Sequence, residues 1–136
     1  MENNERVVRD FIAAWPRLDV DEIVDYFAID GVYHNMPLRV VQGHAALKVM
    51  ISRFIGGWTA TEWDILTLIS SGDIVVAERL DRTQLGDRYV ELPCCGVFEM
   101  QAGKIKALAI TSAPVMALNR WVKPLAPACR AAQACS

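Results

Sequence analysis

The sequence predicts a single α+β domain in which about three N-terminal helices pack on a curved antiparallel sheet. Apolar residues recur at helical spacing in the first part of the chain, and four strand-like runs separated by turn signals follow. Consecutive strands that are joined by short turns favour antiparallel pairing. No linker, repeat or low-complexity block divides the 136 residues, a usual length for one domain. We expect the domain to cover residues 1–122 and a C-terminal tail to cover residues 123–136.

Three helices are expected before the strands. The first carries an apolar stripe and should end near Pro16. The second begins at Asp19, which suits an N-cap, and stops at the turn signal Asp30-Gly31. The third is closed by Gly56 and the glycine after it. In chain order, the segments that carry these helical patterns are residues 4–19, 19–31 and 43–57.

The later part of the chain changes to strand-like segments. The predicted strands cover residues 58–71, 73–85, 88–101 and 104–113. The separators between them are turn signals that contain Gly72, Gly86 and Gly103. A short extended segment, residues 32–38, precedes the third helix. Pro93 within the third strand indicates a sheet edge or a bulge, because proline cannot donate a ladder hydrogen bond. A short helix is expected after Pro114, before the alanine-rich tail.

The composition excludes some classes of function. The net charge is −2 with acids and bases mixed along the chain, so a concentrated basic face for nucleic acid is absent. No apolar run reaches the length of a membrane span, and the charged start MENNERVVRD is unlike a signal sequence. We therefore expect a cytoplasmic protein. The hydrophobic content of 53% is high, which indicates a large interior surface or an apolar patch covered by a partner.

The four cysteines predict neither a zinc site nor a disulfide framework. Cys94 and Cys95 are adjacent, so within a strand they face opposite ways, and no zinc-ligand spacing occurs. A bridge between Cys129 and Cys135 in the tail has no further support. We expect free thiols in a reducing compartment, with Cys94 and Cys95 in the core.

One strand raises the main functional question. In VVAERLDRT, Val75, Ala77, Arg79, Asp81 and Thr83 share one face, because side chains alternate along a strand. If the apolar start of this row is in the core, the arginine and the aspartate are buried too, which is tolerable only for a hydrogen-bonded pair. Such a pair is a functional candidate. The alternative is a structural pair, or a strand whose far end is exposed.

A second candidate lies in VYHNMP. Alternation places Tyr33 and Asn35 on one face and His34 on the other. A hydroxyl and an amide suit the positioning of a water or a substrate oxygen. The alternative is a packing tyrosine and an asparagine that makes a turn before proline. His44 stands at a helix start, like a surface or cap residue, and two isolated histidines predict no metal site.

The motifs YHNMPL, ERLD and GVFEMQAGKI, in this order and at these separations, resemble those of the limonene-1,2-epoxide hydrolase family. The resemblance runs from about the second helix to the start of the last strand. It implies a cone-shaped fold, similar to that of ketosteroid isomerase, scytalone dehydratase and polyketide cyclases. It also implies a homodimer.

The resemblance further implies a catalytic set. In that family a tyrosine, an asparagine and a base aspartate hold a water, a second aspartate protonates the epoxide oxygen, and an arginine bridges the two carboxylates. Tyr33 and Asn35 match the water-positioning pair, Arg79 matches the bridge, and Asp81 matches the general acid. The position of the base holds Ile110, which cannot accept a proton. The carboxylates that could replace the base are Glu78, Glu91 and Glu99.

The resemblance places further side chains around the substrate. Apart from the four catalytic candidates, the predicted pocket residues are Phe54, Ile55, Trp58, Thr83, Leu92, Cys94, Ile110 and Ser112. By spacing alone, Trp58 suits a core or dimer position as well as the pocket. The mostly apolar walls favour a terpenoid or polyketide-like small molecule over a charged one.

Three functions are compatible with these residues. The first is an acid–base enzyme, without metal or organic cofactor, that opens or rearranges an epoxide or a related oxygenated centre, as a hydrolase, cyclase or isomerase. The second is a non-catalytic protein that binds an apolar ligand in a degenerate site. The third is a proton-transfer isomerase resembling ketosteroid isomerase, in which Asp81 is ionised. Ile110 counts most strongly against hydrolysis by water.

Overall fold

The computed structural model describes residues 3–112 of the chain. Its helical segments are α1 (Asn4–Ala14), the 3-10 turn η1 (Trp15–Arg17), α2 (Val20–Asp25) and α3 (His44–Ile55). Its strands are β1 (Phe27–Asn35), β2 (Val41–Gln42), β3 (Ala60–Ser71), β4 (Ile74–Leu85), β5 (Arg88–Gln101) and β6 (Lys104–Ser112). The predicted boundary at residue 122, the helix after Pro114, and Cys129 and Cys135 lie outside the described residues. No helix in residues 3–112 is long and apolar enough to span a membrane.

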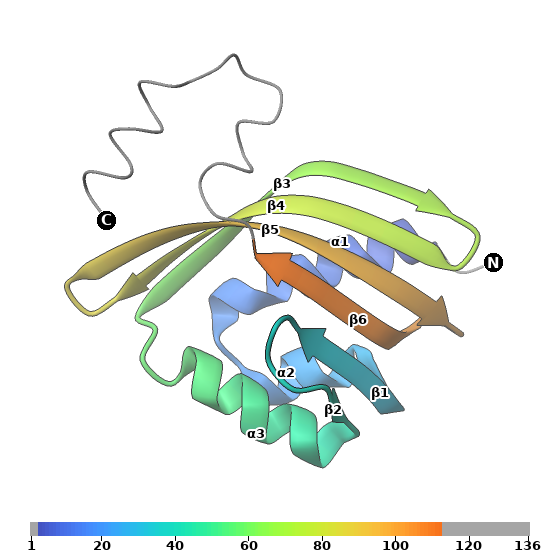
Figure 1. The fold of residues 1–136 in the computed structure, drawn as a ribbon, viewed down its shortest axis with the longest axis horizontal. Coiled ribbons are helices and arrows are strands. Elements are labelled where there is room, and N and C mark those ends of the chain that lie inside the picture. The colour runs from blue at the N-terminus through green and yellow to red at the C-terminus, as the bar shows by residue number, and fades with distance from the viewer. Residues whose placement is uncertain (1–2, 113–136) are drawn as a thin grey trace.

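The six strands form one sheet in the order β2-β1-β6-β5-β4-β3. Strands β3 to β6 make the predicted antiparallel meander. Strand β1 pairs parallel with β6, so the complete sheet is mixed rather than wholly antiparallel. This pairing brings the YHN segment of β1 beside the last strand, although they are far apart in the sequence (Figure 1).

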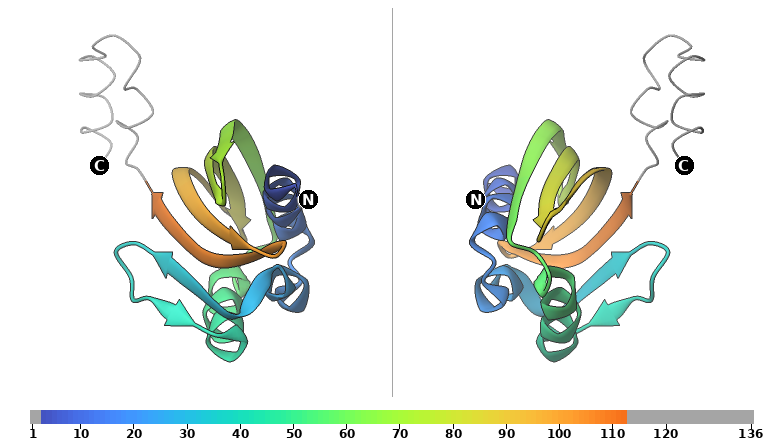
Figure 2. Two further views of the ribbon diagram at one scale, coloured as in Figure 1. Left: turned by 90° about the vertical axis from the view of Figure 1, so that its right-hand side faces the viewer. Right: turned by 90° about the vertical axis from the view of Figure 1, so that its left-hand side faces the viewer.

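The sheet is strongly curved and open, as the side views show (Figure 2). The helices lie on its concave side: α1 and η1 contact β3, and α3 packs against α2, β1 and β2. Strand twist produces such curvature, and the helices bury the inward side chains. This arrangement confirms the predicted α+β fold of a curved sheet with three N-terminal helices.

The local signals at the helix ends account for most of the helix boundaries. The side chain of Asn3 caps α1 by accepting a hydrogen bond from the Arg6 amide at 3.0 Å. Asp19 caps α2 as predicted, accepting from the Glu22 amide at 3.2 Å. Helix α1 stops at Ala14, just before Pro16 in η1, and α3 stops immediately before Gly56.

The predicted second helix is wrong in its last turn, and the turn predicted at Asp30-Gly31 is also wrong. Helix α2 ends at Asp25, and β1 runs through both residues with an irregular register opposite β6. A Cβ on Gly31 would lie 2.9 Å from the carbonyl oxygen of Ala28 and 3.1 Å from that of Ile105. The glycine therefore permits close contact of backbones within the sheet.

The core lies between the helices and the concave face of the sheet. Phe11 of α1 is its centre, with edge-to-face contacts to Trp15, Tyr26, Phe27 and Phe98 at ring-centroid distances of 5.6–6.0 Å. Such aromatic pairs stabilise packing beyond the area that they bury. The aromatic core therefore covers one end of the concave face of the sheet. The candidate functional side chains lie at the other end of the inward-facing rows.

Candidate active site

The inward row of β4 changes from apolar to polar along its length. Val75 and Ala77 are fully buried, and Arg79, Asp81 and Thr83 continue the row at 1%, 7% and 8% exposure. The face of β4 that starts in the core therefore carries the arginine and the aspartate inward. The two side chains do not point to solvent.

Arg79 and Asp81 form a bidentate ion pair. Arg79 Nε donates to Asp81 Oδ1 at 2.9 Å, and Arg79 Nη2 donates to Asp81 Oδ2 at 3.0 Å. The guanidinium carbon also lies 4.3 Å from the centre of the Trp63 ring, a cation–π geometry. Burial lowers the pKa of Arg79, but the hydrogen bonds and charge of Asp81 raise it above its ordinary value. The arginine is therefore a permanent cation, and the pair is charge-compensated.

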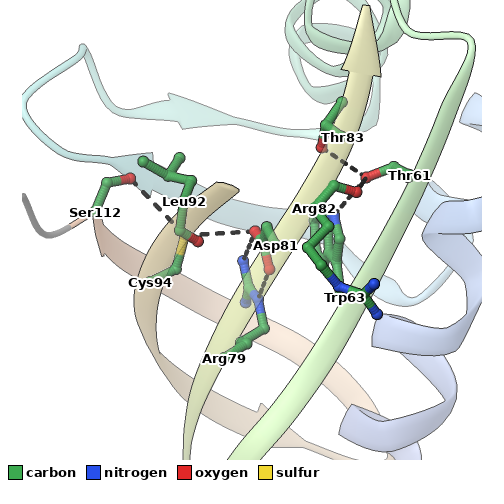
Figure 3. Close-up of polar contacts among 9 residues, drawn as sticks. All are labelled: Thr61, Trp63, Arg79, Asp81, Arg82, Thr83, Leu92, Cys94 and Ser112. Atoms are coloured by element: carbon green, nitrogen blue, oxygen red, sulfur yellow. Dashed lines mark hydrogen bonds and ion pairs between the residues drawn. The ribbon is translucent and has the colours of Figure 1, made fainter. Parts of the chain in front are cut away.

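Cys94 of β5 extends the pair toward the last strand (Figure 3). Its thiol donates to Asp81 Oδ2 at 3.4 Å, and its sulfur lies 3.9 Å from the Ser112 hydroxyl on β6. Burial, followed by the charge of Asp81, raises the pKa of Cys94 to about 12. The group is thus a neutral thiol that hydrogen-bonds the carboxylate, and not a thiolate nucleophile.

Tyr33 and Asn35 reach the same region from β1. The parallel register pairs Tyr33 with Leu108 and Asn35 with Ile110. Tyr33 is only 2% exposed, and burial raises its pKa above the ordinary tyrosine value. Its hydroxyl therefore stays protonated and can donate a hydrogen bond.

These side chains surround a cavity of about 120 Å³. Its lining consists of Trp15, Tyr33, Asn35, Phe54, Trp58, Trp63, Arg79, Asp81, Leu92, Cys94, Ile110 and Ser112. All four catalytic candidates are therefore placed around one space, with six of the eight predicted pocket residues. Most of the wall is aromatic or aliphatic, which is typical of a small-molecule site.

Two predicted pocket residues do not line the cavity. Thr83 hydrogen-bonds Thr61 at 2.8 Å between hydroxyl oxygens, one step beyond Asp81 along the row. Ile55 is partly buried against the core. Its neighbour Phe54 takes the cavity position, because adjacent residues on a helix point in different directions.

Trp15 and Trp63 line the cavity, and sequence reasoning missed both. Their rings stack at 4.3 Å, and Trp63 also lies beside Asp81 in the β3–β4 register. In the sequence, Trp15 continues the apolar stripe of the first predicted helix, and such a stripe does not separate a core residue from one that borders a cavity. Alternation along β3 could have put Trp63 on an inward face, but only the register reveals its neighbour.

The cavity wall is apolar at position 110, where the resemblance implies a base. Ile110 is 3% exposed and lines the cavity, and within residues 3–112 Asp81 is the only carboxylate in the lining. None of the three possible replacements lines it. Glu78 accepts from Thr67, Glu91 accepts from Tyr89, and Glu99 lies 3.6 Å from Lys106.

The histidines lie elsewhere. His44 Nε2 is 2.9 Å from the Phe27 carbonyl oxygen, and neither it nor His34 lines the cavity. Across residues 3–112, no three His, Cys, Asp or Glu side chains gather as metal ligands do.

Comparison with known proteins finds solved structures of the same fold. A solved LEH-like epoxide hydrolase from M. tuberculosis is 26% identical, with a TM-score of 0.72 over 81% of this chain and 82% of that chain. SalBIII, described as an epoxide hydrolase/cyclase-like enzyme, is 18% identical, with a TM-score of 0.72 over 82% of this chain and 92% of its own. A Shewanella denitrificans protein described as a SnoaL-like polyketide cyclase is 12% identical, with a TM-score of 0.72 over 81% and 90% of the two chains.

The last two likenesses show a common fold. The family assignment comes from the sequence, because the model of the limonene-1,2-epoxide hydrolase catalytic domain matches residues 2–109. The matched segment contains both β1 and β4, which carry the four catalytic candidates. The chain therefore belongs to the limonene-1,2-epoxide hydrolase family.

Proposed function

We propose that this protein is an acid–base enzyme that opens or rearranges an epoxide, or a related oxygenated centre, of a small hydrophobic molecule. The observation that carries the proposal is a buried carboxylate–guanidinium pair in the wall of a mostly apolar cavity. The reaction needs proton transfer but no electron transfer, so the proposal includes no metal or organic cofactor.

Asp81 is assigned the proton transfers. The proposed reaction starts from the protonated form of Asp81, which gives its proton to the epoxide oxygen while the C–O bond breaks and an incoming oxygen bonds to the carbon. Asp81 then takes a proton from that incoming oxygen, which returns the carboxyl group to its starting state. Arg79 holds the carboxyl group through its two hydrogen bonds, and Cys94 fixes one of its oxygens from the other side.

Tyr33 and Asn35 are assigned the positioning of the reacting oxygen atoms. A neutral phenol donates a hydrogen bond, and an amide both donates and accepts, so together they can orient a water or a substrate hydroxyl. Both residues line the cavity, and Asn35 pairs with Ile110 in the β1–β6 register, which supports this assignment.

Ile110 bears on which nucleophile is used. The lining formed by the described residues holds one carboxylate and so offers no second carboxylate base to activate a water. An internal hydroxyl of the substrate is already held near the epoxide carbon, so its attack depends less on a separate base. The proposal therefore favours a cyclase or isomerase over a hydrolase, with a terpenoid or polyketide-like substrate.

Turnover of a panel of terpene epoxides and epoxy-alcohols tests the proposal. Asp81→Asn should lower turnover by about 10²–10⁴-fold, the usual effect of losing a general acid. Asp64→Asn is the matched control, because Asp64 pairs with Arg82 on the outer face. Equal residual turnover by wild type and Asp81→Asn would show that the acid is assigned wrongly.

A second variant tests the role of position 110. Ile110→Asp adds a second carboxylate to the cavity wall and should raise the fraction of diol formed by attack of water. Product analysis by gas chromatography, with wild type as reference, measures the ratio of diol to cyclised product. An unchanged ratio in a folded variant contradicts the proposed reason for the preference.

Ile110 also favours one alternative, a non-catalytic protein that binds an apolar ligand. Ligand-dependent thermal stabilisation that persists in Asp81→Asn, with no product from any epoxide, would support it. An isomerase resembling ketosteroid isomerase would instead exchange a substrate C–H in heavy water. Both measurements use the same ligand panel.

We also propose a homodimer formed through the outer face of the sheet. Ile69, Val76, Val97 and Ala109 are aligned across β3 to β6 by the strand register. Ile69 and Val97 are 60% and 43% exposed. An apolar row of this kind is a candidate interface, and analytical ultracentrifugation of wild type and Val97→Lys tests it.

A further inference from the structure

One nitrogen of the buried arginine has no hydrogen-bond acceptor. Arg79 Nε and Nη2 both bond Asp81, but Nη1 is buried and has no partner within residues 3–112. A buried donor without an acceptor is costly, more so when it carries charge, and is usually satisfied by water or by a ligand. The unpaired N–H is therefore a candidate contact for the molecule that fills the cavity.

Arg79 Nη1 lies next to Gly96. A Cβ built on Gly96 would lie 3.4 Å from Arg79 Nη1, 3.3 Å from Phe98 and 3.5 Å from Leu108. Gly96 pairs with Ile110 across the β5–β6 ladder, and Arg79 and Ile110 both line the cavity. The lack of a side chain at residue 96 thus leaves space beside the guanidinium, and no described residue accepts a hydrogen bond from Nη1.

A second donor in the wall is also unsatisfied. Trp15 lines the cavity, and its indole Nε1 is buried without a partner in the described part of the chain. Two N–H groups therefore lack acceptors around a space that is otherwise mostly hydrocarbon. A ligand with an apolar body and an oxygen acceptor would complement such a wall, and the positive charge of Arg79 favours an anionic oxygen.

We propose that the cavity binds a small apolar carboxylate, one oxygen of which accepts a hydrogen bond from Arg79 Nη1 beside Ile110. The ligand carboxylate and Asp81 then share one guanidinium. The cavity has a volume of about 120 Å³, which is enough for a ligand whose apolar part is about one six-membered ring. This inference rests on the proposed function only in taking the cavity as the substrate site, and it narrows the substrate class to hydrophobic epoxides that also carry a carboxylate.

Calorimetric titration of the full chain with two ligands of one shape tests the proposal. Cyclohexanecarboxylate should bind at least about tenfold more tightly than cyclohexanecarboxamide, because the hydrogen bond from Nη1 then joins two charged groups. The two ligands share the ring, so the ratio of their dissociation constants isolates the charge. Equal binding, or tighter binding of the amide, overturns the proposal without any variant.

Two variants locate the subsite. Ile110→Asp places a protein carboxylate where the ligand's would lie, and it should remove the tenfold preference. Thr111→Asp adds the same charge one residue further, where the side chain is exposed, and it should keep the preference. Circular dichroism checks that both are folded. A preference that survives in folded Ile110→Asp overturns the assignment to Nη1.

The outcome separates this inference from the proposed enzyme. A carboxylate preference that Ile110→Asp removes, in a protein that turns over no epoxide, supports the subsite and rejects the proposed reaction. Turnover of neutral epoxides that depends on Asp81, together with equal binding of the two cyclohexane ligands, rejects the subsite and leaves the reaction standing.

Discussion

Because the Arg79–Asp81 pair is buried, we can predict how much stability the protein loses when the pair is broken. In Asp81→Ala, a guanidinium that is 1% exposed loses both of its hydrogen-bond acceptors. Breaking a buried pair by removing one partner costs about 3–5 kcal/mol. Because a domain of this size is stable by about 5–15 kcal/mol, Asp81→Ala should lose a large part of its stability.

The converse variant should be milder. The Asp81 side chain is 10% exposed and lies on the cavity wall, so in Arg79→Met the remaining carboxylate can reach water. We expect a loss of about 1–3 kcal/mol. The double variant Arg79→Met with Asp81→Leu replaces both charges by apolar groups of similar size, and it should cost much less than the sum of the single losses.

Urea unfolding followed by tryptophan fluorescence measures these differences, and equal slopes of the free energy against urea show that the denatured states are comparable. A double variant whose loss equals the sum would refute the reasoning, as would an Asp81→Ala loss below about 1 kcal/mol. The double variant is also informative about function. It should be folded yet inactive, because the stability of the pair can be replaced whereas its proton cannot.

Three further predictions follow from contacts of the same pair. Gly96→Ala should lower stability by about 1–3 kcal/mol in thermal unfolding, because the added Cβ would lie only 3.3 Å from the Phe98 ring and 3.4 Å from Arg79 Nη1. Trp63→Phe should lose about 1 kcal/mol in urea unfolding, since it removes the indole hydrogen bond to Thr61 and weakens the cation–π contact. Cys94, with a pKa of about 12, should be alkylated very slowly by iodoacetamide at pH 8 in native protein, as mass spectrometry of its peptide can show.

Each of these predictions has a contradicting outcome. A stabilised Gly96→Ala would mean that the guanidinium is not confined by residue 96, and an unchanged Trp63→Phe would mean that the indole contacts contribute nothing. Rapid native labelling of Cys94 would contradict its burial. The raised pKa of Cys94 also makes stability depend on pH. The thiol loses its proton at a lower pH in the unfolded chain than in the folded protein, so the free energy of unfolding should fall as pH rises from about 9 toward 12.

The sequence alone determined the local elements of this protein. Helical spacing, caps and glycine turns predicted the three helices and the four-stranded meander, because these signals depend on neighbouring residues. Alternation along one strand put Arg79 and Asp81 on the face that starts with Val75, and the structure buries that face. Asp30-Gly31 misled the prediction, because a turn signal there is overridden by the close backbone contact of Gly31 in the sheet.

The tertiary structure decided which faces meet. The parallel pairing of β1 with β6 puts Asn35 beside Ile110, and the β3–β4 register puts Trp63 beside Asp81. The β4–β5 and β5–β6 registers align Ala77, Gly96 and Ile110 across the sheet. Alternation fixes the face on which a side chain lies, but not which residue of a distant strand lies opposite. That register is set by packing of the whole sheet against its helices. The unpaired Arg79 Nη1 arises only from these registers.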